Sequence, residues 1–271
     1  MNNLPIYQVD AFSETLFGGN PAAVVPLPKF PSETVMQSIA TENNLSETAY
    51  VVFRGPGKFD IRWFTPTREV RLCGHATLAS AHVLFSSAED PPAKMRFRTR
   101  EAGSIVVTAN DDGSYAMAFS ADKPEKIRAP KGLRGMLGGL KPQEVYRGKD
   151  DLLVVLKNQK QVDGLHPNLQ MVAALKHRGL LVTAPGEQTD VVSRGFYPAF
   201  GIDEDPVTGS AHTLLVPYWA ERLGRRGKAI TFRQGGPRQG VLTGRMKGKK
   251  KVELTGRAIT YLSGQVLLDR L

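Results

Sequence analysis

The sequence predicts an α+β protein built from two similar halves. The turn Gly74-His75-Ala76 precedes an apolar, helix-like run, and Gly209-Ser210-Ala211 repeats this arrangement 135 residues later, which is about half of the 271-residue chain. Many short strand patterns and few strong helix patterns surround these turns. A doubly wound parallel sheet would need more crossover helices, so the α+β class is favoured.

Helix and strand signals alternate in the first half. Ser32 followed by Glu33 is a typical helix start, and Asn43-Asn44 a typical end. A second helix is predicted over 77–85, and residues 54–58 predict a hairpin turn because they contain glycine and proline. Gly18-Gly19-Asn20-Pro21 predicts a further turn. Strands are predicted at 6–12, 22–25, 49–53, 59–64, 95–99, 103–109 and 115–119.

The second half repeats this style. Strands are predicted at 152–156, 180–183 and 191–196, and a helix over 214–222. The glycine-rich stretch 131–140 fits neither a phosphate loop nor a dinucleotide fingerprint, and we interpret it as a connection or a weak helix. We expect residues 1–115, completed by a C-terminal strand at 258–271, to form the first half. Residues 116–257 then form the second.

Composition favours a globular protein of the cytoplasm. Hydrophobic residues make up 41% of the chain and charged residues 23%. No apolar run approaches the roughly 18 residues of a membrane helix, and the N-terminal residues lack the pattern of a signal peptide. The single cysteine excludes an intramolecular disulfide and fits a reducing compartment.

The net charge of +10 raises the question of nucleic-acid binding. The densest basic run is Lys247-Gly-Lys-Lys-Lys251, and 246–254 has the pattern of a turn between two exposed strands. No zinc-finger spacing, aromatic RNA-binding signature or basic helix accompanies the run. A solvated basic face is therefore favoured over a nucleic-acid site.

Four sequence blocks carry a family resemblance. They read Phe17-Gly-Gly-Asn-Pro-Ala-Ala-Val-Val25, Asn44-Leu-Ser-Glu-Thr-Ala-Tyr-Val51, Leu72-Cys-Gly-His-Ala-Thr77 and Glu204-Asp-Pro-Val-Thr-Gly-Ser-Ala211. In this order they resemble the PhzF-like family of phenazine-biosynthesis isomerases. The resemblance implies the diaminopimelate epimerase-like fold, in which each half is a mixed sheet around a central helix and the active site lies between the halves. It also suggests a homodimer.

Glu47 is the candidate general acid/base. From its position alone it reads as a solvated turn residue or as the partner of an Asn44 cap. In the functional interpretation, the carboxyl group lies in an apolar cleft, where it exchanges protons near neutral pH. The resemblance favours this second interpretation, because the matching glutamate of the family moves a proton between two carbons of its substrate.

The two repeated turns supply the other candidate site residues. The resemblance implies catalytic roles for His75 and Asp205 and a substrate contact for Ser210, although a histidine or an aspartate at such a turn is more often structural. Backbone N–H groups of Gly74 and Gly209 lie at predicted helix starts, where they are suited to a substrate carboxylate. Asn20 is expected to add a polar contact at the rim of the pocket.

Cys73 distinguishes this chain from two-thiol racemases. Diaminopimelate epimerase-like and proline racemase-like enzymes use one cysteine from each half, and this chain has one cysteine in total. Two-cysteine racemisation is therefore excluded. Cys73 is either a reactive thiol, its pKa lowered by the start of a helix, or a small packing residue.

Metal and cofactor signals are weak. The five histidines form no His-Glu-x-x-His pattern, and there is no cysteine cluster, so we expect neither a metal nor a cofactor. The sequence predicts a cofactor-independent isomerase acting on a small anionic, carboxylate-bearing metabolite. A one-base epimerase, an elimination in the same pocket and a non-catalytic metabolite- or partner-binding protein remain as alternatives, because a fold does not determine a reaction.

Overall fold

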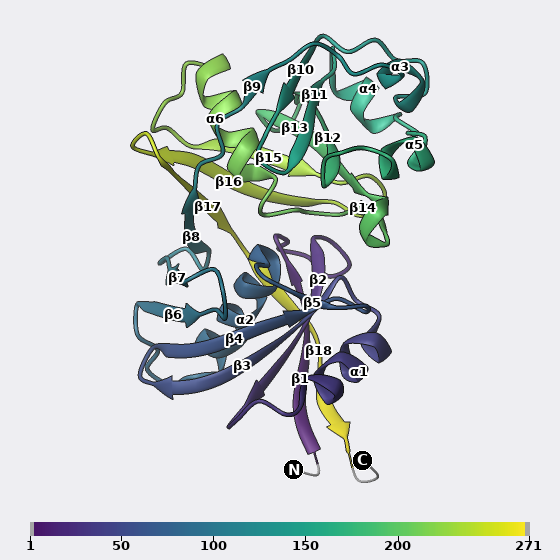
Figure 1. The fold of residues 1–271 in the computed structure, drawn as a ribbon. Coiled ribbons are helices and arrows are strands. Elements are labelled where there is room, and N and C mark those ends of the chain that lie inside the picture. The colour runs from purple at the N-terminus through teal and green to yellow at the C-terminus, as the bar shows by residue number, and fades with distance from the viewer. Residues whose placement is uncertain (1–2, 269–271) are drawn as a thin grey trace. The chain divides into compact units, whose positions relative to one another are not determined.

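A computed structural model describes residues 3–268, which fold as two compact units (Figure 1). Unit 1 is Met1–Ala118 together with Thr255–Leu271, and unit 2 is Phe119–Leu254. No helix among the described residues is long and apolar enough to cross a membrane.

Unit 1 holds two helices and a mixed sheet. The helices are α1 (Glu33–Asn43) and α2 (Gly74–Ser87). The strands are β1 (Asn3–Ala11), β2 (Asn20–Leu27), β3 (Glu47–Gly55), β4 (Lys58–Phe64), β5 (Glu69–Val70), β6 (Lys94–Arg98), β7 (Ser104–Ala109), β8 (Tyr115–Ser120, which continues into unit 2) and β18 (Ala258–Leu267).

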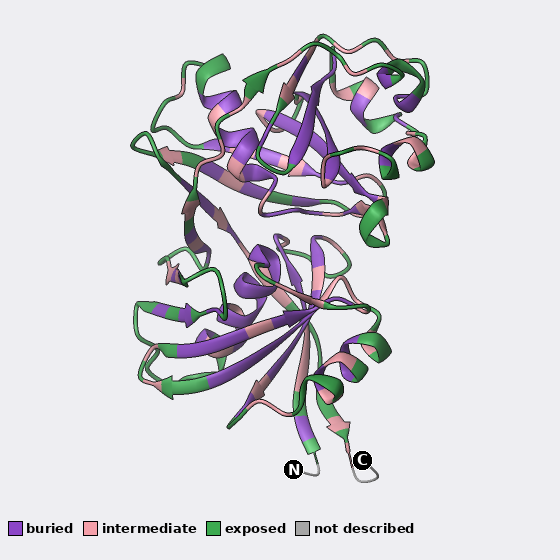
Figure 2. Ribbon diagram, viewed as in Figure 1, coloured by how far each residue is buried: buried purple, intermediate pink, exposed green. Residues whose placement is uncertain are grey.

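The sheet of unit 1 runs β18-β1-β2-β3-β4-β6-β7-β8, with the short β5 beside β4. β2 pairs with β3 in parallel and β4 with β6 in parallel, and the other pairs are antiparallel. α2 contacts β18 and β1 near one end of this order and β7 near the other, so the sheet curls around the helix. Figure 2 shows α2 mostly in the colour of buried residues. A helix that is apolar nearly all round is one that the fold encloses.

The capping residues of α1 are those that the sequence predicts. The side chain of Ser32 accepts a hydrogen bond from the backbone N–H of Val35, and Asn44 ends the helix in the left-handed conformation at φ 48°. Met36 and Ile39 pack on Tyr50 of β3, whose hydroxyl donates to the carbonyl of Met36. α1 is thereby fixed on the sheet next to the start of β3.

Unit 2 contains four α-helices, one short 3-10 helix and a second mixed sheet. The helices are α3 (Leu133–Met136), α4 (Gln159–Asp163), α5 (Leu169–Ala173), α6 (His212–Arg222) and η1 (Pro198–Phe200). The strands are β9 (Glu125–Lys126), β10 (Glu144–Arg147), β11 (Asp151–Val155), β12 (Gly179–Pro185), β13 (Val191–Tyr197), β14 (Ile202–Asp205), β15 (Ile230–Gln234), β16 (Gly240–Lys247) and β17 (Lys251–Gly256, which continues into unit 1).

The sheet of unit 2 runs β9-β10-β11-β12-β13-β15-β16, with β14 beside β13. α6 takes the place that α2 has in unit 1. Tyr218 of α6 donates to Glu144 of β10, Trp219 donates to Thr183 of β12, and the helix also contacts β15 and β16. The mixed sheet wrapped around a central helix, expected for each half, is present in both units.

Some elements differ from the sequence-based expectation at their ends. α2 and α6 begin earlier than predicted, at Gly74 and His212. Glu47 is the first residue of β3 rather than part of a turn, and Asn20 already belongs to β2. The stretch 131–140 contains the one-turn helix α3. Parallel pairing of β2 with β3 extends both strands toward their shared beginning, a long-range effect without a local sequence signal.

Candidate active site

Three elements of unit 1 begin at one place and bring five candidate residues together. Asn20 starts β2, Glu47 starts β3, and His75 is the second residue of α2, directly after the N-cap Cys73 and Gly74. Because β2 and β3 are parallel, with Ala22 opposite Glu47, their starts lie at the same end of the sheet. α2 contacts both strands, so its first turn lies beside them.

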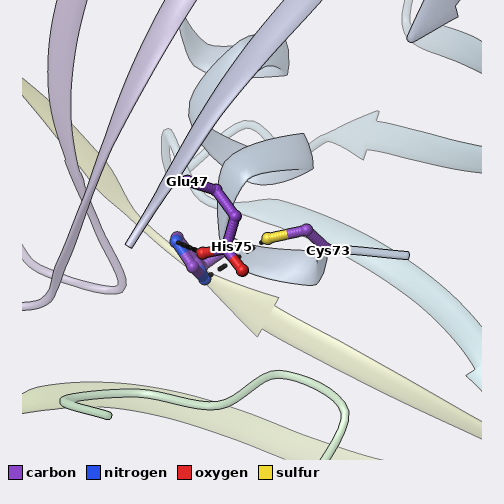
Figure 3. Close-up of side chains that lie close together, drawn as sticks. All are labelled: Glu47, Cys73 and His75. Carbon is purple, nitrogen blue, oxygen red and sulfur yellow. Dashed lines mark hydrogen bonds and ion pairs between the residues drawn. The ribbon is translucent and has the colours of Figure 1, made fainter. Parts of the chain in front are cut away.

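Partly buried Glu47 and buried His75 form a pair (Figure 3). Oε2 of Glu47 lies 3.2 Å from Nε2 of His75, and their side chains are 13% and 5% exposed. The two atoms are close enough to form an ion pair, but their geometry is not that of a hydrogen bond. Glu47 is thus the more accessible of the two groups and faces the imidazole.

The other ring nitrogen of His75 faces two polar neighbours. Sγ of Cys73 lies 3.5 Å from Nδ1, and Nδ2 of Asn20 lies 3.3 Å from it. Asn20 is fully buried, so the expected position at the rim of a pocket is wrong. Its amide instead orients the imidazole from within the unit.

The electrostatics of this cluster favour a charged His75. Burial by itself lowers the pKa of His75, whereas the negative charges that Cys73 and Glu47 carry when ionised raise it, and the net shift takes that pKa well above 6.5. Burial, followed by the charge of Glu47, raises the pKa of the Cys73 thiol to about 11. The thiol is therefore neutral near neutral pH, so of these two groups only the carboxylate of Glu47 adds negative charge beside His75 there.

The raised pKa of Cys73 favours a packing residue over a reactive thiol, the two interpretations that the sequence left open. The start of a helix lowers the pKa of a thiol, but Cys73 is buried and lies near an anion. These two effects exceed that of the helix dipole, which is modest. The carbonyl of Cys73 accepts hydrogen bonds from the backbone N–H and the hydroxyl of Thr77, which fixes the first turn of α2.

Glu47, Cys73 and His75 also carry atoms that bind metals. One such atom from each lies within 4.8 Å of the other two. Sulfur, imidazole nitrogen and carboxylate oxygen are all zinc ligands. However, Sγ of Cys73 lies 3.5 Å from Nδ1 whereas Oε2 of Glu47 lies 3.2 Å from Nε2, so the two groups face different ring nitrogens. A single ion would contact all three only after the ring or the carboxylate moved, and the arrangement fits proton transfer better.

The remaining candidates lie in unit 2, around the start of α6. Asp205, the last residue of β14, accepts a 2.6 Å hydrogen bond from the hydroxyl of Thr208. Gly209 and Ser210 lie between this contact and α6. The hydroxyl of Ser210 accepts a 2.9 Å hydrogen bond from Nη1 of Arg178. The candidate residues thus form two sets, one in each unit.

Sequence reasoning missed several polar residues that support the second set. Gln234 is fully buried and accepts a hydrogen bond from the backbone N–H of Thr208. Arg178 holds Ser210 and forms an ion pair with buried Asp151. The only sequence signal was the Gln234-Gly235-Gly236 stretch, and no local pattern marks Arg178. Its partners lie 27 and 32 residues away in the chain.

Comparison with known proteins extends over nearly the whole chain. A family described as "Phenazine biosynthesis-like protein" matches residues 9–264. An uncharacterized isomerase of Pseudomonas aeruginosa is 47% identical over 265 residues, covering 98% of this chain and 99% of that protein.

Solved structures show the same relationship. A PhzF-family protein from Enterococcus faecalis superposes with a TM-score of 0.92 at 42% identity, covering 98% of this chain and 100% of the other. A hydroxyproline epimerase from Agrobacterium vitis shares the fold at a TM-score of 0.62 and 13% identity, covering 99% and 94%. The α+β, epimerase-like fold is therefore confirmed, and the chain belongs to the PhzF family of phenazine biosynthesis-like proteins.

Proposed function

We propose that the protein is a cofactor-independent isomerase that moves or exchanges a carbon-bound proton of a small, carboxylate-bearing metabolite. The observation that carries this proposal is the pairing of partly buried Glu47 with buried His75 at the start of β3 and α2. The similarity to a protein named an isomerase supports the same reaction class.

Glu47 acts as the general base and then as the general acid. Its carboxylate takes a proton from a substrate carbon, so that the C–H bond breaks and an O–H bond forms on Glu47. The electron pair moves into the adjoining unsaturated or carbonyl group of the substrate. Glu47 then returns the proton to a different carbon, or to the same carbon after exchange with water. The charged imidazole of His75 stabilises the negative charge that develops between these steps.

Residues at the two helix starts are proposed to bind the substrate. The first N–H groups of a helix lack partners within the helix, and they attract anions. Gly74 provides such a group at α2, and Gly209 provides one just before α6. Asp205 provides a carboxylate suited to a hydroxyl or amino group of a metabolite, and Ser210 provides a hydroxyl that can donate to an oxygen atom.

Hydrogen exchange tests the proposal even while the substrate is unidentified. Purified protein is incubated with a metabolite extract in heavy water, and mass spectrometry detects compounds that gain one deuteron. Glu47→Gln keeps the size of the side chain but removes the base, so the gain is expected to disappear while ligand binding remains. Glu42→Gln, at an exposed position on α1, is the matched control and should behave as wild type.

The same experiment separates the alternatives. A one-base epimerase would give deuterium gain with inverted configuration at a single carbon, and an elimination would give a product of lower mass. A non-catalytic binding protein would give no gain with any variant. Gain that persists in Glu47→Gln would show that another residue is the base, and would overturn the assignment of Glu47.

Two further proposals concern the oligomeric state and the cellular location of the protein. The family resemblance supports a homodimer, and the single cysteine supports a location in the reducing cytoplasm. Sedimentation equilibrium across a concentration series checks the first, with a single species of twice the chain mass as the expected result. Cell fractionation checks the second.

A further inference from the structure

The two units share one strand pattern, which allows their residues to be matched. In unit 1 the pairs β1/β2, β2/β3, β3/β4, β4/β6 and β6/β7 are antiparallel, parallel, antiparallel, parallel and antiparallel. In unit 2 the pairs β10/β11, β11/β12, β12/β13, β13/β15 and β15/β16 follow the same series. β2, β3 and α2 therefore correspond to β11, β12 and α6.

The matched elements begin with two equivalent clusters. In unit 1, Asn20 starts β2, Glu47 starts β3, and His75 lies in the first turn of α2. In unit 2, Asp151 starts β11, Arg178 directly precedes β12, and Ser210 lies just before α6. The charged side chain at the start of β3 is the carboxylate of Glu47, whereas the one just before β12 is the guanidinium of Arg178.

Arg178 is held in a fixed orientation. Nε and Nη2 donate to the two carboxylate oxygens of Asp151, at 2.9 and 2.5 Å. The guanidinium carbon lies 5.2 Å from the ring centre of Tyr197. This fork-on-carboxylate geometry is specific to arginine, because a lysine ammonium lacks the planar pair of donors.

The third contact of Arg178 determines which hydrogen bonds the hydroxyl of Ser210 can make. Nη1 donates to Oγ of Ser210 at 2.9 Å, which occupies one lone pair of the hydroxyl. Among residues 3–268 this hydroxyl donates no hydrogen bond, so its O–H is available to a ligand. The guanidinium of Arg178 lies within hydrogen-bond distance of Oγ, and its positive charge disfavours the binding of an ammonium group to this hydroxyl.

The geometry points to Arg178 as a positioning residue that makes Ser210 a subsite for a carboxylate or carbonyl oxygen of the substrate. This inference rests on the proposed function for the identity of the ligand as a substrate. It assigns opposite tasks to equivalent places in the two units: Glu47 exchanges a proton, and Arg178 orders the hydroxyl that holds an anionic or electron-rich group.

The positioning itself is tested on the ligand-free protein by nuclear magnetic resonance of arginine side chains. A guanidinium fixed by Asp151 and Ser210 rotates slowly about its Nε–Cζ bond, so Arg178 should give separate Nη1 and Nη2 signals. Ser210→Ala should shift the Nη1 signal because Nη1 loses its acceptor, and Asp150→Asn, at the exposed neighbour of Asp151, should not. Averaged Nη signals in the wild type would overturn the inference.

Binding is tested with sodium formate and methylammonium chloride at equal ionic strength, observed at the backbone amide of Ser210. Formate should shift this signal saturably, and methylammonium should not. Arg178→Met should weaken formate binding about tenfold because a charged hydrogen bond is lost, and Arg178→Lys should restore it only in part. Arg147→Met removes a surface charge of the same unit and should have no effect. Equal affinity in Arg178→Met, or no saturable formate shift in the wild type, would overturn the inference.

Failure of the proposed function is distinguishable from failure of this inference. If wild type exchanges no deuterium but formate binds as described, the reaction assignment fails and the subsite remains. If exchange occurs, Arg178→Met should raise KM for the exchanged metabolite much more than it lowers kcat, since Arg178 acts on binding. A loss confined to kcat would contradict the positioning role. Amide spectra of each variant confirm that it is folded.

Discussion

The side-chain amide of Asn20 lies 3.3 Å from Nδ1 of His75, with Nδ2 facing the ring. An amide N–H facing Nδ1 suits a neutral ring that carries its proton on Nε2, on the side of Glu47. In the charged ring both nitrogens donate, so the amide must turn to present Oδ1. The orientation of Asn20 is thereby coupled to the charge of His75.

We expect the Asn20 amide and the His75 ring to titrate together. Their resonances should shift with one midpoint well above 6.5, because negative charge around His75 outweighs its burial. Glu47→Gln removes one of these charges and should move both midpoints to lower pH. Nitrogen-15 spectra recorded across pH provide the measurement. The Asn110 amide, which donates to Ser114, should not follow this transition, and separate midpoints for Asn20 and His75 would refute the coupling.

His75 should also make stability depend on pH in the alkaline direction. Its folded-state pKa is raised, so its contribution is complete below the unfolded value of 6.5 and is lost as pH rises through the folded pKa. Urea unfolding of wild type should therefore show declining stability above pH 6.5, and Glu47→Gln should show a shallower decline. The control Glu42→Gln should follow wild type, and an equal decline in all three proteins would exclude His75 as the cause.

Cys73 should react slowly with iodoacetamide near neutral pH. Its pKa is raised to about 11, and the thiolate is the nucleophile. The rate should rise steeply toward that pH, and it should be higher in Glu47→Gln because the charge of Glu47 contributes to the raised pKa. Mass spectrometry is unambiguous because the chain has one cysteine. Protein unfolded in urea is the reference, and rapid labelling of the folded protein at neutral pH would contradict the expected burial.

Local signals in the sequence predicted most elements of the fold well. Ser32 and Asn44 mark the ends of α1, and the Gly74-His75 turn leads into α2, because capping and turn chemistry depend on near neighbours. The repeat at Gly209 correctly indicated a second central helix. These features do not depend on distant contacts.

Other features depend on contacts between distant residues. The burial of Asn20 and the pKa of Cys73 follow from packing α2 against the starts of β2 and β3. Arg178 gains its role from partners on β11 and before α6. No periodicity or motif specifies such pairings, since they arise from the order of strands in the sheet.

Gly179→Ala should destabilise unit 2. A methyl group at this position would lie 2.3 Å from the ring of Tyr197, which packs against β12 beneath Arg178. Overpacking of this kind costs about 1–3 kcal/mol. Urea unfolding measures the loss, and Gly135→Ala, where the nearest atom lies 3.8 Å away, is the matched control. Unchanged stability in Gly179→Ala would mean that Tyr197 adjusts without cost.

His212 should make stability fall in acid. It is fully buried at the start of α6, where its Nδ1–H donates to the carbonyl of Thr208, and burial lowers its pKa from 6.5 to about 4. Because the pKa of His212 is lowered in the folded protein, the unfolded chain gains a proton below pH 6.5 while the folded protein does not. Stability is therefore lost progressively as pH falls from 6.5 toward 4, by about 3 kcal/mol in total.

The change in stability with pH isolates this contribution. Unfolding of His212→Gln is measured relative to its own value at neutral pH, so any direct cost of the substitution cancels. The variant should lose less stability on acidification than wild type, because it has no imidazole to protonate. His166→Gln, at an exposed position of the same unit, should retain the wild-type slope. If His212→Gln also keeps that slope, the imidazole is protonated in the folded state and does not stay neutral beside Thr208.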